Sequence, residues 1–139
     1  MKPVLTLILF IAGFTISQAQ LSQTPMTFTG DFMITKVAGE DVSETALSLT
    51  IDNKKRSISG TTGCNNYMTD YALRGTALQF SYVANTKRAC PHDDIEQLYY
   101  DNLSEVTSFL KKGDTITLYR DSDAIITGIS KKALIDNNK

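Results

Sequence analysis

The chain has 139 residues, of which 42% are hydrophobic and 21% charged, a composition typical of one globular domain. Its 14 basic and 15 acidic residues give a net charge of -1, which provides no reason to expect nucleic acid as a partner. The single histidine, His92, excludes sites that need two histidines, and the two cysteines, Cys64 and Cys90, permit one intramolecular disulfide.

Residues 1–19 have the pattern of a secretory signal peptide. Lys2 precedes an apolar run from Val4 to Ile16, and the segment closes with Ser17-Gln18-Ala19. The run is shorter than the ~20 residues that a membrane-spanning helix needs, so we expect cleavage after Ala19 and no membrane span in the mature chain. The mature protein is then expected to be soluble in the periplasm or outside the cell. Residues 20–29 lack strong periodicity and are interpreted as a flexible lead-in.

Alternation of apolar and polar residues predicts short strands through most of the remaining chain. The alternating runs are 30–37, 47–51, 56–61, 71–73, 78–82, 106–110, 115–119 and 124–129. In the run 78–82, this pattern places Leu78, Phe80 and Tyr82 on one face. Gly60, inside another run, indicates a bulge or the close approach of another backbone.

Between residues 90 and 104 the pattern changes to that of a helix. One apolar stripe with helical spacing consists of Ile95, Leu98, Tyr99 and Leu103. Asp93 or Asp94 is placed to cap the N-terminus of this helix.

These elements together predict a mainly β chain of the α+β type. We expect a small antiparallel, barrel-like curled sheet of about eight strands, with one helix packed on it. The domain is predicted to span residues 30–130, and residues 131–139 are interpreted as a polar tail.

The two loops that hold the cysteines carry a resemblance to a known family. The first loop reads Gly60-Thr61-Thr62-Gly63-Cys64-Asn65-Asn66-Tyr67, and the second reads Ala84-Asn85-Thr86-Lys87-Arg88-Ala89-Cys90. A helix containing Glu96 follows. In this order they resemble the META domain, or HslJ-like, family of bacterial cell-envelope proteins, from about Gly30 to Ile129. Phe32 replaces the family's usual tryptophan, and Arg88 replaces a methionine or another apolar residue.

The resemblance implies a barrel-like fold and an envelope-associated accessory protein without an established catalytic activity; some family members are linked to stress or drug tolerance. We therefore expect an exported, monomeric, non-enzymatic binding module without a cofactor or metal, whose partner is an envelope protein. A second hypothesis is a carrier that encloses an apolar small molecule or lipid in the barrel. The weakest alternative is an enzyme that uses cysteine and histidine.

The two cysteines are predicted to form a structural disulfide, because thiols of exported proteins usually become oxidised. Two other interpretations stay open. In one, His92 activates Cys64 or Cys90 as a nucleophile. In the other, both cysteines bind zinc together with His92 and Asp93, although no CxxC spacing is present.

The loops also supply a candidate binding surface close to the disulfide. Its residues are Asn65, Asn66, Tyr67, Thr86 and Arg88. The competing interpretation for Asn65 and Asn66 is structural, because short amide side chains often satisfy the polar backbone groups of a loop.

Overall fold

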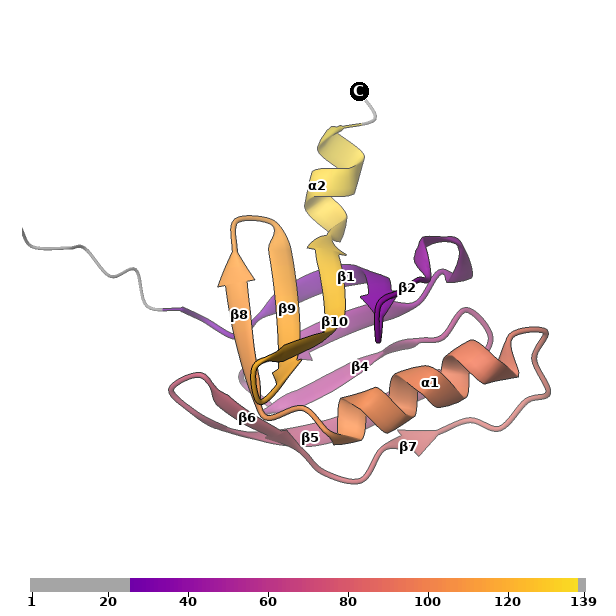
Figure 1. Ribbon diagram of the computed structural model, residues 1–139, viewed down its shortest axis with the longest axis horizontal. Helices are drawn as coiled ribbons and strands as arrows, with labels where there is room; N and C mark the ends of the chain where they lie inside the picture. The colour runs from indigo at the N-terminus through magenta and orange to yellow at the C-terminus, as the bar shows by residue number, and fades with distance from the viewer. Residues whose placement is uncertain (1–25, 138–139) are drawn as a thin grey trace, which may run out of the picture.

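The computed structural model describes residues 26–137, so the predicted signal peptide and residues 20–25 of the lead-in lie outside the described residues. Eight antiparallel strands close into a barrel (Figure 1). In barrel order they are β1 (Gly30–Val37), β3 (Ser48–Asp52), β4 (Ser57–Thr61), β5 (Asn66–Arg74), β6 (Ala77–Phe80), β8 (Ser108–Lys112), β9 (Thr115–Arg120) and β10 (Asp123–Ser130). Strand β10 pairs with β1, which closes the barrel and confirms the predicted fold class.

The remaining elements lie around this barrel. Strand β2 (Glu40–Asp41) pairs with β1, β7 (Ala84–Asn85) pairs with β5, and a short 3-10 helix covers Ser43–Thr45. Helix α1 (Asp93–Ser104) runs alongside β7 in Figure 1, and α2 (Lys131–Asp136) follows β10 directly. The range expected as a polar tail therefore begins with a helical segment. Within residues 26–137, no helix is long and apolar enough to cross a membrane.

The inward side chains of the strands fill the barrel and pack against α1 in one hydrophobic cluster. Phe32 is 1% exposed, so phenylalanine occupies a core position where the resemblance leads one to expect tryptophan. On α1, Tyr99 and Leu103 are fully buried, while Ile95 and Leu98 are half-buried at the edge of the cluster. The predicted helical stripe is therefore confirmed as the face that covers the barrel.

Two aromatic residues differ from the expectations. Phe28 lies in the range expected as a flexible lead-in, yet it is 2% exposed, with its ring centroid 4.7 Å from that of Phe109 and 4.9 Å from that of Tyr71. The packed part of the chain therefore begins before Gly30. Tyr82 was expected on the same face of a strand as Phe80 but is 89% exposed, because β6 ends at Phe80 and the alternation does not continue through residue 82.

Candidate functional site

A disulfide joins the loop between β4 and β5 to the segment that precedes α1. It links Cys64 to Cys90, which are 26 residues apart, as the sequence predicted. Because each sulfur is bonded to the other, neither is a thiolate that His92 could activate or that zinc could bind. His92 is exposed at the start of α1. Within residues 26–137, no group of three histidine, cysteine or acidic side chains is arranged to hold a metal ion.

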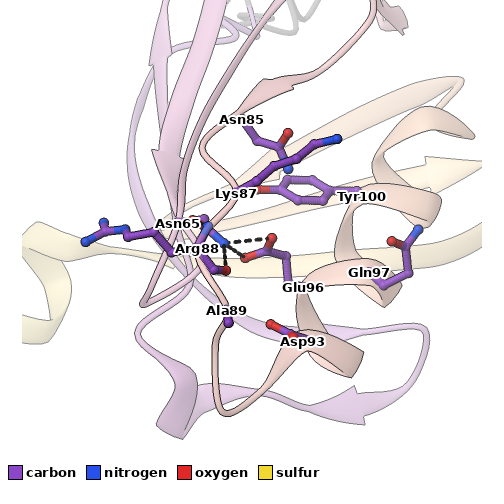
Figure 2. A pocket seen from close by; sticks show the side chains of 9 residues that line it. All are labelled: Asn65, Asn85, Lys87, Arg88, Ala89, Asp93, Glu96, Gln97 and Tyr100. Carbon is purple, nitrogen blue, oxygen red and sulfur yellow. Dashed lines mark hydrogen bonds between the residues drawn. The ribbon is translucent and has the colours of Figure 1, made fainter.

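The side-chain amide of Asn65 organises the region around the disulfide (Figure 2). Asn65 is 1% exposed. Its Oδ1 accepts hydrogen bonds from the Thr86 hydroxyl at 2.8 Å and from the Arg88 main-chain N–H at 2.9 Å. Its Nδ2 donates to the Arg88 carbonyl at 3.0 Å and faces both carboxylate oxygens of Glu96 at 3.1 Å. One amide therefore holds the Arg88 backbone from both sides and ties it to α1.

Glu96, in the first turn of α1, receives neutral donors only. The Thr62 hydroxyl donates to its Oε2 at 2.6 Å, in addition to the amide of Asn65. Among the described residues, no lysine, arginine or histidine forms a salt bridge with this carboxylate. Local sequence patterns did not assign Thr62 or Glu96 to the site. The sequence feature that could have indicated Glu96 is its spacing: it lies three residues before Tyr99 and four before Tyr100, on the same side of the helix.

The five residues of the candidate surface are neighbours, but they do not all lie at the surface. Asn65 and Tyr67 are buried, whereas Asn66, Thr86 and Arg88 are exposed. The Arg88 guanidinium donates to the Cys64 carbonyl at 2.7 Å, and Figure 2 shows its side chain pointing away from Glu96. The Thr86 hydroxyl, besides contacting Asn65, accepts a hydrogen bond from the Asn66 main-chain N–H at 3.0 Å.

The start of α1 is arranged differently from the predicted cap. His92 is the N-cap residue, and it makes no capping hydrogen bond through its side chain. Asp93 instead accepts a hydrogen bond at Oδ1 from the Cys90 main-chain N–H at 3.0 Å. Its carboxylate therefore fixes the connection between the disulfide and the helix.

Three tyrosines connect this region to the barrel core. The hydroxyls of Tyr67 and Tyr99 lie 2.6 Å apart, and the Tyr67 hydroxyl donates to the Ser48 carbonyl at 2.8 Å. The ring of Tyr100 lies 5.8 Å from that of Tyr67. Burial, followed by the effect of the neighbouring phenols, raises the pKa of Tyr67 well above its ordinary value. Burial also raises the pKa of Tyr99.

Ionisation of these tyrosines is expected to lower the stability of the protein in alkaline solution. An unfolded tyrosine has a pKa of about 10, whereas folding keeps Tyr67 and Tyr99 neutral to higher pH. Their contribution to the free energy of unfolding is therefore complete below pH ~10 and falls as the pH rises towards the folded pKa values. Urea unfolding at several pH values measures this fall. If the free energy of unfolding of the Tyr67→Phe variant falls as steeply with pH as that of the wild type, ionisation of Tyr67 does not cause the loss of stability.

A polar cleft of about 320 Å³ lies between α1 and the segment that follows β7. Its lining residues, labelled in Figure 2, are Asn65, Asn85, Lys87, Arg88, Ala89, Asp93, Glu96, Gln97 and Tyr100. The disulfide and the Asn65 amide both fix the wall that carries Arg88. The cleft is therefore formed by segments whose positions the fold constrains covalently and by hydrogen bonds.

Asn65→Ala is expected to destabilise the protein by about 2–3 kcal/mol, because it leaves several buried or half-buried polar groups without their partner. The neighbouring Asn66→Ala is the matched control, because Asn66 is exposed and only its main chain takes part in the hydrogen bonds described above. Urea unfolding followed by circular dichroism compares the two variants. Equal midpoints would show that the Asn65 amide does not hold the two loops together.

The fold and this cleft define a class of protein: a small closed antiparallel barrel covered by one helix, with two loops joined by a disulfide at the start of that helix. The META domain family model matches residues 14–132, and the chain belongs to this family. An NMR structure of a protein from Burkholderia xenovorans is similar, with 25% identity and a TM-score of 0.58, over 74% of this chain and 82% of that one. A second NMR structure, 18% identical, has a TM-score of 0.56 over 73% of this chain and 89% of that one. A search of the curated proteins found no match.

Proposed function

We propose that this META domain protein is an exported, monomeric, non-enzymatic accessory module that binds a partner protein in the cell envelope. The observation that carries the proposal is the cleft beside the disulfide, because an exposed polar cleft with constrained walls is suited to recognition. The signal-peptide pattern of residues 1–19 supports export, and a disulfide is typical of exported proteins. The family resemblance supports a role in stress tolerance.

The polar side chains at this site support binding rather than catalysis. The two sulfurs are bonded to each other, and the Asn65 amide and the Glu96 carboxylate hold the loops on α1. These sulfur, amide and carboxylate groups are engaged in bonds that stabilise the shape of the two loops. The carrier hypothesis receives less support, because the inward side chains of the strands pack into one cluster that fills the barrel.

Export is tested by expressing the full chain in a bacterium with a periplasm and measuring the intact mass of the protein in each fraction. We expect a periplasmic or secreted protein that begins at Gln20. Leu9→Arg, which places a charge in the apolar run, is the control and should keep the full-length chain in the cytoplasm. Full-length wild-type protein found only in the cytoplasm would contradict the proposal.

Partner binding is tested by photo-crosslinking in intact cells. A crosslinking amino acid replaces the exposed Gln97, on the α1 wall of the cleft, or, as the control, Lys112 next to the turn between β8 and β9, far from α1 in Figure 1. We expect a discrete crosslinked protein from the first position only. Equal products from both positions, or none from either, would contradict a partner at the cleft.

A further inference from the structure

We propose that the cleft between β7 and α1 binds an extended segment of the partner protein, which adds as a strand to β7 and places a lysine or arginine side chain against Glu96. The inference rests on the proposed function, because it specifies the chemistry by which the partner is recognised. Three features of the cleft lead to it: a free strand edge, a carboxylate without a cation, and a buried hydroxyl without a hydrogen bond.

The strand edge is established by the direction of the main-chain groups. The Thr86 N–H donates to the Asn66 carbonyl at 3.0 Å, and both main-chain groups of Arg88 bond to the Asn65 side chain. Alternate residues of an extended strand direct these groups to opposite edges, so those of Asn85 and Lys87 point away from β5. Within residues 26–137, they make no hydrogen bond to another residue, and β7 pairs only with β5. Such an edge accepts an added strand.

The charge of the opposite wall favours a cationic side chain. The first turn of α1 holds Asp93, Asp94 and Glu96, and the helix contains no lysine or arginine. Glu96 lies in the cleft, half-buried, and forms no salt bridge with any described residue. The Arg88 guanidinium does not compete for it, because it bonds to the Cys64 carbonyl. An incoming ammonium or guanidinium group would complete the set of donors around this carboxylate.

The hydroxyl of Tyr100 supplies the third feature. It is buried and lacks a hydrogen-bond partner of good geometry among the described residues. Burial raises the pKa of this phenol, and the nearby Asn85 side chain opposes the rise only in part. Figure 2 shows the tyrosine ring extending from α1 towards the segment that carries Asn85 and Lys87. A buried hydroxyl without a partner is unfavourable, so a ligand that bonds to it gains affinity.

The side chain of Lys87 stands in the way of such a ligand. It is exposed and lines the cleft, so it must move aside when an extended segment enters. Lys87 is therefore a competitor of the incoming cation.

The probe is a capped pentapeptide of alternating threonine and lysine, titrated into the 15N-labelled, oxidised mature protein. We expect saturable shifts of the amide signals of Asn85 and Lys87. The same peptide with glutamate in place of lysine, or with methylated main-chain nitrogens, should bind at least tenfold more weakly, because it lacks the cation or the strand donors. Butylamine should likewise bind at least tenfold more weakly, because an amine alone cannot pair with the strand edge.

Three variants test the residues individually. Tyr100→Phe removes only the hydroxyl, so we expect an unchanged fold and affinity about fivefold lower, the factor of one typical hydrogen bond. Glu96→Gln should lower affinity about tenfold and weaken its dependence on salt, because Asp93 and Asp94 remain on the same wall. Lys87→Ser should raise affinity, because it removes the competing cation while keeping the main-chain groups. If Glu96→Gln fails to fold, Tyr100→Phe and the methylated peptide still decide the question.

The inference would be overturned if the glutamate peptide or the methylated peptide bound as tightly as the lysine peptide. It would also be overturned if the shifted amide signals lay only on another face of the protein. If the peptide fails while position 97 still crosslinks to an envelope protein, the strand-addition inference is wrong and the proposed function stands. If both experiments fail, the proposed function is wrong as well.

Discussion

Gly60→Ala is expected to destabilise the barrel by about 4 kcal/mol, the largest effect of any single substitution considered for this protein. A Cβ at this position would lie 1.9 Å from the carbonyl oxygen of Ser48 and 2.9 Å from the ring of Tyr67. The oxygen belongs to the backbone of β3, so it cannot move away without separating β3 from β4. The same oxygen accepts the hydrogen bond of the buried Tyr67 hydroxyl, which the displacement would also weaken.

The matched control for this prediction is Ser59→Ala in the same strand. Ser59 is exposed, and its substitution should change the free energy of unfolding by less than ~0.5 kcal/mol. Urea unfolding followed by circular dichroism measures both variants. A Gly60→Ala protein that unfolds at the same urea concentration as the Ser59→Ala protein would show that β3 and β4 do not approach so closely.

Replacing both Cys64 and Cys90 by alanine is expected to give the second largest loss of stability. The disulfide joins residues 26 positions apart, and in the chain-entropy model a loop of this length corresponds to about 3.5 kcal/mol. For a domain of this size, the melting temperature should fall by about 15 °C. The variant should still fold, because Asn65 and Thr62 continue to hold the two loops against α1.

Reduction of the wild-type protein is the control for the double substitution. Dithiothreitol should lower the melting temperature of the wild type by a similar amount and leave that of the double variant unchanged. Titration of the native, unreduced protein should find no free thiol. Two reactive thiols in that titration would contradict the disulfide, and slower alkylation in His92→Ala would favour the cysteine–histidine hypothesis instead.

The sequence by itself was sufficient for the eight strands of the barrel, for α1 and for the cysteine pair. A strand places alternate residues on opposite faces and a helix repeats every 3.6 residues, so local spacing distinguishes them. This spacing predicted the strand over residues 30–37, in which Phe32 and Ile34 are buried, and the stripe of α1 that holds the buried Tyr99 and Leu103. The disulfide followed from the presence of only two cysteines in a chain whose first residues have the pattern of a signal peptide.

Only the tertiary structure decided how these elements come together. The pairing of β1 with β10 joins residues about ninety positions apart, and no local pattern encodes such a partner. Likewise, the role of Asn65 depends on Arg88 and Glu96, which lie 23 and 31 residues later. A polar side chain acquires its function from the groups within hydrogen-bonding distance. For Asn65 those groups come from separate segments of the chain, so folding, rather than local spacing, determined that it became the buried centre of the site.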